Sequence, residues 1–414
     1  MTRWEQIKSG QFADAVTDVF ADLDRMGFRP RFEPLERGSP PRAGEAILLN
    51  YAPVARMNKY QALLYARGRE LGFGVIPTLR FEDLDKAPWP GRRVIHFHWI
   101  ASVTRGAADG TEASSRAAAF LRDLDRLKEQ LGARLVWTAH NVLPHDSAFP
   151  EVDLELRRGF VERLDAVHLL SHSSRATLED TFDRALPAPF VVEHPTYENA
   201  YADFTPRSAA RFELGVSEDD FVVLCFGSIQ KYKGYERLKA AFESFADRCP
   251  GVSPRLVIAG KPVDEALAAS LRRWAATRSD VMIHARNVPD DEVHMFFRAA
   301  DASVITHENV LNSGVALLAL TFGNPLLAPD LGAFREIEEM GLLLYRAGDD
   351  DSLVDALCAA TRPEFALRRE ATALARRRFH PHRISTAFFT GLMEALGWPV
   401  PHPRMDRELQ TSCP

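Results

Sequence analysis

Short runs of apolar residues alternate with stretches of helical periodicity along most of the chain. A run of about four to eight apolar residues is typical of a buried strand, and apolar residues at helical spacing indicate a helix packed on one face. In the first half, helices are predicted to end at Gly72 and Gly132. The predicted strands of this half lie at residues 46–51, 74–79, 94–100, 135–141, 166–170 and 189–195. This alternation predicts a doubly wound α/β domain with a parallel sheet.

The second half of the chain restarts the same rhythm. Its predicted strands lie at residues 221–227, 255–260, 281–285, 302–306, 325–329 and 342–346. Its predicted helices carry apolar faces at residues 238–245, 267–274, 293–300 and 313–322. The chain therefore predicts two consecutive Rossmann-like domains.

The boundary between these domains is predicted in residues 197–206, which are polar and aromatic without periodicity. We place an N-terminal domain at 1–200 and a C-terminal domain at 201–382. By analogy with other two-Rossmann enzymes, residues of about 383–414, with a last helix, should cross back and complete the first domain.

The first 45 residues contain a predicted amphipathic helix. Its apolar face consists of Phe12, Val16, Phe20 and Leu23. The helix could cover the first domain, or it could contact a membrane surface or an acceptor lipid. The sequence leaves both interpretations open.

Composition narrows the function classes. A chain of 414 residues with 46% hydrophobic residues can form two or three packed domains, and a net charge of −6 argues against a general nucleic-acid binder. The four cysteines form no CxxC pair, which argues against zinc and thioredoxin-like sites. No signal-peptide pattern and no apolar run of about 18 residues is present, so we expect a cytoplasmic protein, with peripheral contact at the inner face of a membrane left open.

Candidate ligand-binding residues follow the strands of the second half. Ligands of open α/β sheets bind at the carboxyl ends of the strands, so these loops are the places to inspect. Gly227 and Ser228 follow the first strand and precede Lys231 and Lys233, a pattern that suits a pyrophosphate approaching the backbone. Gly260 ends the second strand. Solvated lysines in an ordinary turn are the competing interpretation.

Two further loops complete this set. Asn287 and the backbone at Val288 could meet a base edge, although helix capping explains much of that loop. Asn312, Ser313 and Gly314 begin an apolar helix, whose free N–H groups and positive dipole end would stabilise a diphosphate. Each loop alone has an ordinary structural explanation, and the four together indicate a nucleotide site.

Histidines gather at predicted strand ends of the first half. His96 fits a core histidine, and His98 lies two residues further along. His140 ends a strand, and His145 and Asp146 follow within a few residues. Such groups can act as a general base or can bind a sugar hydroxyl.

Several other chemistries lack their motif. Neither GxGxxG nor GxxxxGK[ST] is present, which argues against dinucleotide oxidoreductases and P-loop proteins. Asp-Leu-Asp triplets occur at residues 22–24, 83–85 and 123–125, but two of them fall on predicted helices. We therefore predict no metal site.

Several stretches resemble GT4-like GT-B glycosyltransferases. Residues 221–329, with FGSIQKYKGYERL, LVIAGKP, NVPDDEVHMFFRAAD and TFGNPLLAP, resemble the donor domain of that family. HFHWI, VWTAHNVLPHD and NKYQALLYARGRELG are similar to acceptor-domain motifs of related bacterial enzymes. The resemblance implies two Rossmann-like domains that face a cleft, with a C-terminal helix crossing back to the first.

The resemblance also implies roles for matching residues. Lys233, with Lys231, would hold the donor phosphates, and the main chain of Val288 would meet the base. His140 would lie near the transferred sugar. The diphosphate loop would include Ser313 and Gly314, and the acceptor side would include Asn58, Tyr60 and His98.

One departure from the family pattern concerns the mechanism. GT4 enzymes usually carry two glutamates eight positions apart, and the matching positions here are Val310 and Leu318. Glu308 and Asn312 could substitute. The departure leaves the stereochemical outcome open and suggests a divergent exopolysaccharide or glycolipid mannosyl-, glucosyl- or glucuronosyltransferase.

These observations favour a metal-independent hexosyltransferase that acts on a glycan, glycolipid or small-molecule acceptor. The co-substrate would be a GDP- or UDP-sugar, with no cofactor and no nucleic-acid partner. If the enzyme inverts, His140, His145 and Asp146 are the candidate bases. A sugar-nucleotide epimerase and a non-catalytic nucleotide-sugar-binding subunit remain alternatives.

Overall fold

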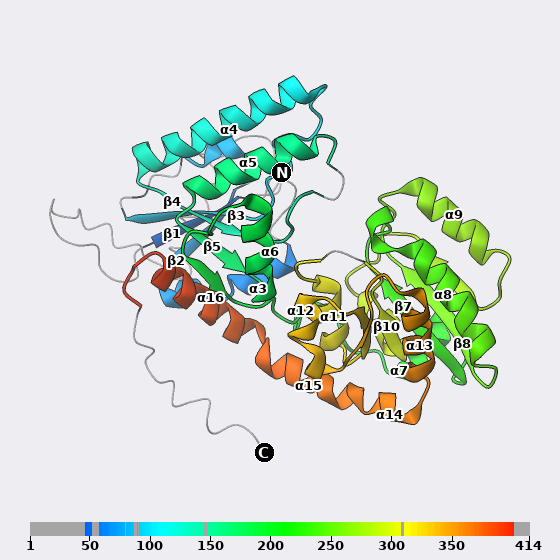
Figure 1. Ribbon diagram of the computed structural model, residues 1–414. Helices are drawn as coiled ribbons and strands as arrows, with labels where there is room; N and C mark the ends of the chain where they lie inside the picture. The colour runs from blue at the N-terminus through cyan, green and yellow to red at the C-terminus, as the bar shows by residue number, and fades with distance from the viewer. Residues whose placement is uncertain are drawn as a thin grey trace, which may run out of the picture. The chain divides into compact units, whose positions relative to one another are not determined.

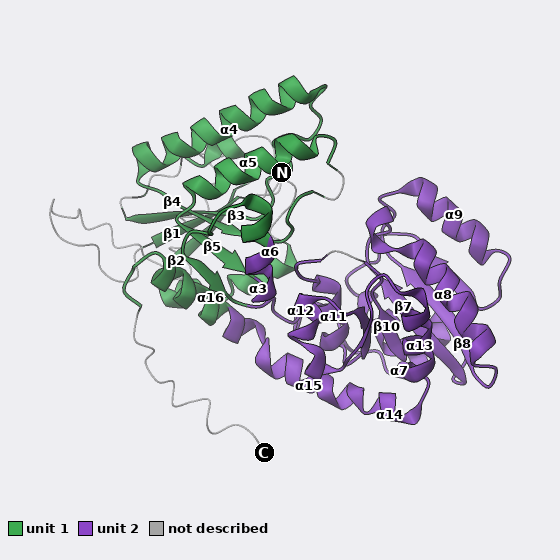
Figure 2. Ribbon diagram, in the orientation of Figure 1, with its two compact units in different colours: residues 1–169, 178–192, 385–414 green, residues 170–177, 193–384 purple. Residues whose placement is uncertain are grey.

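The computed structural model describes residues 46–51, 58–78, 80–86, 89, 91–144, 147–307 and 310–400. The predicted N-terminal amphipathic helix lies outside this part of the chain. Figure 2 shows two compact units. Unit 1 comprises Met1–Leu169, Leu178–Val192 and Ser385–Pro414, and unit 2 comprises Leu170–Thr177 and Glu193–Ile384.

Unit 1 is built on a six-stranded parallel sheet of order β2-β1-β3-β4-β5-β6 (Figure 1). Its strands are β1 (Ala46–Tyr51), β2 (Phe73–Thr78), β3 (Arg92–Phe97), β4 (Arg134–Thr138), β5 (Ala166–Leu169) and β6 (Pro189–Val191). Its helical segments are α3 (Lys59–Leu64), η1 (Arg69–Leu71), η2 (Phe81–Asp83), α4 (Gly110–Leu131), α5 (Pro150–Arg163), part of α6 (Ser173–Phe182) and most of α16 (Pro381–Ala395).

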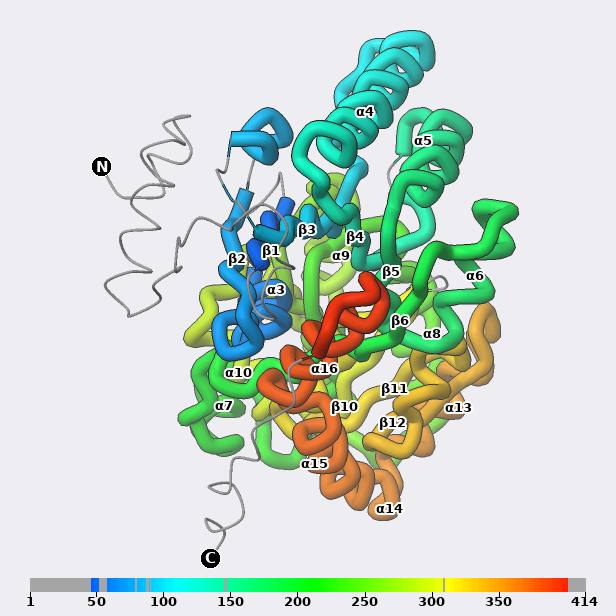
Figure 3. Tube along the Cα trace, turned by 90° about the vertical axis from the view of Figure 1, so that its left-hand side faces the viewer, coloured from blue at the N-terminus to red at the C-terminus, as the bar shows by residue number. Residues whose placement is uncertain are grey.

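Alternate residues of these strands face two different layers. Phe97 packs on Phe120 of α4 and on Phe160 of α5, whereas the neighbouring His96 stacks on Phe388 of α16. Figure 3 shows α4 and α5 on the opposite side of this sheet from α16. Both faces of the sheet are therefore covered, as expected for a doubly wound domain.

Unit 2 contains a second six-stranded parallel sheet, of order β12-β11-β10-β7-β8-β9. Its strands are β7 (Asp220–Phe226), β8 (Ser253–Ala259), β9 (Val281–His284), β10 (Ala302–Val304), β11 (Leu326–Pro329) and β12 (Leu342–Tyr345). Its helical segments include α7 (Arg207–Leu214), η3 (Lys231–Lys233), α8 (Tyr235–Arg248), α9 (Glu265–Ala275), α10 (Val293–Ala299), α11 (Gly314–Thr321), α12 (Gly332–Arg335), η4 (Glu338–Met340), α13 (Asp350–Ala360), α14 (Pro363–Ala366) and α15 (Arg368–Arg378).

The two faces of β7 show how unit 2 is packed. Val223 and Cys225 belong to an apolar cluster that includes residues of α8 and α13. Val222 and Leu224 belong to a second cluster that includes residues of α7, α10 and α11. A strand buried on both faces is apolar at consecutive positions, which is why β7 is one of the clearest runs in the sequence.

In each sheet the strand order reverses at one place. The reversal lies between β1 and β3 in unit 1, and between β7 and β10 in unit 2. The carboxyl ends of strands at such a switch point form the usual ligand crevice of a doubly wound sheet. The switch points therefore direct attention to the loops after β1 and β3, and to those after β7 and β10.

The predicted α/β architecture with two doubly wound sheets is confirmed, and residues from Ser385 onward do return to unit 1. A single helix up to Gly72 was a wrong prediction, because α3 ends at Leu64 and a separate 3-10 turn, η1, leads into Gly72. The sequence also gave no sign of α5. That helix buries Arg157, which lies over the Trp137 ring, so its buried face is only partly apolar.

Replacing Phe388 by alanine should destabilise the protein by about 3–5 kcal/mol, because the fully buried ring fills the core between His96, His168 and Phe190. Denaturant unfolding measures this change. Phe212→Ala is the matched control, since that ring is 82% exposed and its loss should change stability by less than about 0.5 kcal/mol. Equal stability of the two variants would show that α16 does not seal unit 1.

Candidate functional site

The carboxyl end of β7 brings a lysine and a helix start together. Gly227, the residue after β7, has a φ of 115°. A Cβ atom built on Gly227 would lie 2.7 Å from Nζ of Lys233 and 3.3 Å from Cγ2 of Val315, which is in the first turn of α11. The ammonium group of Lys233 and the amino end of α11 therefore meet over the end of β7.

Lys233 is buried although it carries an ionisable amine. Its exposed fraction is 6%, and burial lowers the pKa of its ammonium group. Among the residues that the structure describes, no carboxylate forms an ion pair with Lys233. A desolvated cation at a strand end is a suitable partner for an anionic group of a ligand.

The loop that carries Lys233 is fixed to the neighbouring strand. Thr306, which follows β10, donates a hydrogen bond of 2.6 Å from Oγ1 to the backbone carbonyl of Lys233. Gly234 has a φ of 70°, and a Cβ at that position would clash with the carbonyl oxygen of Thr306. The position of the ammonium group is therefore set by both strands of the switch point.

Gly260 and Lys231 have local contacts in the loops after β8 and β7. A Cβ on Gly260 would clash with the carbonyl of Gly227, so its glycine permits the close approach of two loops. The side chain of Lys231 is 84% exposed and lies 3.7 Å from Asp264. Ser228 Oγ accepts a hydrogen bond of 2.7 Å from Gln230. Of the two predicted lysines, only Lys233 is held over the strand end.

The amino end of α11 is capped as the sequence suggested. Ser313 Oγ accepts a hydrogen bond of 3.3 Å from the N–H of Ala316. A Cβ on Gly314 would lie 3.0 Å from Oη of Tyr197 and 3.5 Å from Nε2 of His194. Asn312, Ser313 and His194 line a cavity of about 40 Å³.

His194 and Tyr197 belong to this site, and the sequence analysis missed them. Burial lowers the pKa of His194 to about 4 and raises the pKa of Tyr197, so both side chains are neutral near pH 7. They lie more than a hundred positions from Gly314 in the chain, and no local motif marks them. Only the fold brings them to α11.

Asn287 and Val288 follow β9, an edge strand of the sheet. Asn287 is exposed, and Val288 is half-buried against the cluster that includes Phe296. Leu318, at one of the positions where GT4 enzymes carry glutamate, packs in the same cluster. A carboxylate at that position would be buried in apolar surroundings, so the departure from the family pattern agrees with the packing.

The switch point of unit 1 holds a cluster of histidines and tyrosines. Nδ1 of His98 lies 2.9 Å from Nε2 of His140, and the Trp99 ring stacks on His140 at a centroid distance of 4.5 Å. The Tyr60 ring meets His140 edge-on at 5.1 Å. The predicted residues His98, His140 and Tyr60 are therefore in direct contact.

Asn58 has a local role in the same unit. Its side chain accepts a hydrogen bond from the N–H of Gln61, and the Gln61 side chain accepts one from the N–H of Asn58. This capping box begins α3 and so positions Tyr60. The predicted residues His145, Asp146 and Glu308 lie outside the described part of the chain, and their roles stay predictions.

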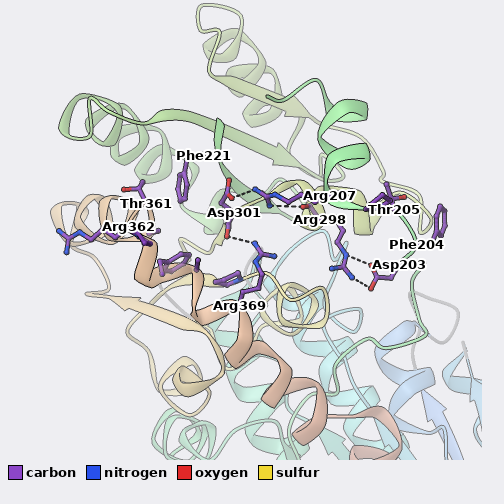
Figure 4. Close-up of a pocket in the computed structure, with 16 residues that line it drawn as sticks. Asp203, Phe204, Thr205, Arg207, Phe221, Arg298, Asp301, Thr361, Arg362 and Arg369 are labelled. Atoms are coloured by element: carbon purple, nitrogen blue, oxygen red, sulfur yellow. Dashed lines mark hydrogen bonds and ion pairs between the residues drawn. The ribbon is translucent and has the colours of Figure 1, made fainter. Parts of the chain in front are cut away.

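A cavity of about 910 Å³ lies elsewhere, at the amino ends of β7 and β10 (Figure 4). Three of the four arginines that line it already have polar partners. Arg298 pairs with Asp203, and Arg207 pairs with Asp301. Arg369 donates hydrogen bonds to backbone carbonyls. No predicted site residue lines this cavity, and these three arginines link separate structural elements.

Comparison with known proteins agrees with this geometry. Residues 206–377 match the family model of glycosyl transferases group 1. Over 353 residues the chain is 27% identical to a GDP-mannose:glycolipid 4-beta-D-mannosyltransferase of Xanthomonas campestris, covering 83% of this chain and 90% of that protein. It is also 34% identical over 188 residues to a D-inositol 3-phosphate glycosyltransferase of Geodermatophilus obscurus, covering 42% and 40% of the two chains.

Solved structures agree on the fold. An Anabaena protein crystallised with UDP and glucose superposes with a TM-score of 0.62 at 15% identity, covering 84% of this chain and 99% of that one. Sucrose-phosphate synthase of Thermosynechococcus elongatus gives a TM-score of 0.64 at 16% identity, covering 85% and 99%. The protein is a glycosyltransferase of the GT-B type. Within that class it is a GT4-like hexosyltransferase. No helix in the described part of the chain is long and apolar enough to cross a membrane.

Replacing Lys233 by alanine should lower the rate of sugar transfer roughly 100-fold or more, because a positioned charge at the leaving group would be lost. Initial rates of nucleotide release measure this change, and circular dichroism checks the fold. Lys231→Ala is the control and should lose much less, since that side chain is exposed. A wild-type rate of turnover in Lys233→Ala would show that Lys233 is not part of the donor site.

Proposed function

We propose that the protein transfers a mannosyl group from GDP-mannose to a glycolipid acceptor, with inversion at the anomeric carbon. The observation that carries this proposal is the extent of the match to the Xanthomonas mannosyltransferase. It spans 353 residues, more than either unit contains, so it includes residues of both. Matches to the inositol-phosphate glycosyltransferases cover less than half of the chain.

The donor diphosphate is assigned to the switch point of unit 2. Lys233 supplies a desolvated cation, and α11 supplies backbone N–H groups and the positive end of its dipole. These groups stabilise the diphosphate as the bond to the sugar breaks, which is the task that a divalent metal performs in other transferases. The exposed backbone after β9, at Asn287 and Val288, is assigned to the base.

The base for the acceptor is assigned to His140. The mannose of GDP-mannose is α-linked, so a β-linked product requires a single displacement with inversion. In that step the acceptor oxygen attacks C1, the electron pair of the C1–O bond leaves with GDP, and the acceptor proton passes to a general base. His140 is half-buried at the strand end and is held by His98 and Trp99.

A glycolipid acceptor presents its sugar at a membrane surface. The reaction therefore also requires peripheral contact with a membrane, which we assign to unit 1. The epimerase and the non-catalytic alternatives have no structural observation in their favour. They differ from the proposed reaction in a product that can be measured.

GDP should stabilise the protein more than UDP, ADP, TDP or CMP in a thermal-shift experiment. At about one hundred times its dissociation constant, a ligand adds roughly 2.7 kcal/mol, which raises the melting temperature by several degrees. The Lys233→Ala variant should lose the GDP shift, because the diphosphate would lack its cation. A shift with UDP alone would retain the donor site and reject the proposed donor.

Incubation with GDP-mannose and a glycolipid acceptor in EDTA should yield a β-mannoside, because the diphosphate is stabilised by protein groups. Mass spectrometry detects the product, and the one-bond C1–H1 coupling gives its anomeric configuration. An α-linked product would reject inversion and the role of His140. An epimerised donor with no acceptor product would favour the epimerase, and binding without any reaction would favour the non-catalytic subunit.

A further inference from the structure

A chain of hydrogen bonds runs through unit 1 from a backbone carbonyl to His140. It crosses β5, β4 and β3 in turn and reaches the switch point. The contacts, in order, are His168 Nε2 to Val192 O at 2.8 Å, Thr138 Oγ1 to His168 Nδ1 at 2.9 Å, His96 Nε2 to Thr138 Oγ1 at 2.8 Å, Tyr65 Oη to His96 Nδ1 at 2.7 Å, Tyr65 Oη to His98 Nε2 at 2.8 Å, and His98 Nδ1 to His140 Nε2 at 2.9 Å.

The interior of this chain is shielded from water. His96, His98, Thr138 and His168 are fully buried, and the Phe388 ring covers His96 and His168. Burial lowers the pKa values of His96 and His98 well below the usual range and raises that of Tyr65. His96 and His98 therefore each carry one ring proton, and Tyr65 carries one hydroxyl proton.

A chain of groups with one proton each can be followed from its fixed end. The carbonyl of Val192 can only accept, so Nε2 of His168 carries a proton. Full burial favours a neutral His168 ring, which then accepts at Nδ1 from Thr138. Thr138 then accepts from Nε2 of His96. Nδ1 of His96 in turn accepts the proton of Tyr65.

The state of His98 follows from the single proton of Tyr65. If that proton points to His96, the oxygen of Tyr65 must accept from Nε2 of His98. A proton that pointed instead to Oδ1 of Asn50, 3.0 Å away, or to Nε2 of His98 would leave the 2.7 Å contact between Tyr65 Oη and Nδ1 of His96 without a proton. The Tyr65 proton therefore points to His96, and Nδ1 of His98 carries no proton and accepts from Nε2 of His140.

We infer that this buried chain fixes the tautomer of His140, so that its Nε2–H donates to His98 and its Nδ1 is the basic atom. The inference rests on the proposed function, in which His140 takes the acceptor proton. When Nδ1 is protonated, the imidazolium still donates from Nε2 to His98, a neutral acceptor. His98 and Tyr65 are thus positioning residues that act through His140, as a third group orients the base in other catalytic constellations.

The described groups that face His140 come from α3 and from the loop after β3. Tyr60 lies on α3, His98 follows β3, and Trp99 stacks on the ring. His96 and His168 lie further along the same chain. A substitution at His98 therefore changes the acceptor of His140 while the aromatic contacts of the ring can persist.

The tautomer can be read directly by ¹⁵N NMR of the full chain labelled at histidine. The His140 signals are assigned by their absence from a His140→Gln variant. A protonated Nε2 and an unprotonated Nδ1 are the expected result, and a proton on Nδ1 overturns the inference. This reading needs no transfer activity, so it stands apart from any failure of the proposed function.

The kinetics of two His98 variants test whether His98 positions His140 for proton transfer. His98→Leu removes the acceptor, and kcat should fall roughly 100-fold while KM for GDP-mannose and the GDP thermal shift stay unchanged. The acidic limb of the rate–pH profile should move to lower pH, because the protonated form of His140 loses its partner. His98→Asn keeps an acceptor oxygen near the position of Nδ1 and should recover most of the rate.

A control variant tests whether the lower kcat of His98→Leu is specific to His98 or follows from the loss of any buried histidine. His294 is also fully buried and contacts Thr205 in unit 2, so His294→Leu should keep kcat within about threefold of wild type. An unchanged rate and pH profile in His98→Leu would overturn the positioning role. So would an equal loss of rate in His98→Leu and His98→Asn.

Discussion

The burial of the Lys233 ammonium group is the constraint on which the switch point of unit 2 depends. In the described part of the chain no carboxylate pairs with this cation, and burying a cation in that way is unfavourable, so the fold must hold it firmly. Gly227 leaves room for the amine, Gly234 lets its loop meet Thr306, and Thr306 fixes the backbone of Lys233. An incoming diphosphate would relieve this unfavourable burial, and binding and catalysis would then draw on the same charge.

The switch points of the two units differ in electrostatic character. In unit 2 the switch point between β7 and β10 gathers a cation and a helix amino end. In unit 1 the switch point between β1 and β3 gathers neutral rings, whose burial lowers the pKa values of His96 and His98. Under the proposed function, the first arrangement would stabilise the diphosphate and the second would accept the acceptor proton.

Sequence patterns predicted the strands well because central strands such as β1 and β7 are buried on both faces and are therefore apolar at consecutive positions. They also pointed to Lys233, Ser313 and His140, which directly follow strands or begin a helix. Sequence patterns did not identify Tyr65, His168 or His194 as site residues, because their contacts join segments that are distant in the chain. The pattern of α5 was weak for a related reason, since Arg157 takes a position on its buried face.

The path of the chain has a consequence for biosynthesis. Residues from Ser385 onward belong to unit 1, and Phe388 covers His96 and His168. A ribosome therefore releases all of unit 2 before the segment that seals the first sheet emerges. Until that segment packs on the sheet, His96 and His168 lack the cover of Phe388. Water can then reach both rings, form hydrogen bonds with them and exchange their protons. The order of translation thus makes the working arrangement of the first unit one of the last features of the enzyme to form.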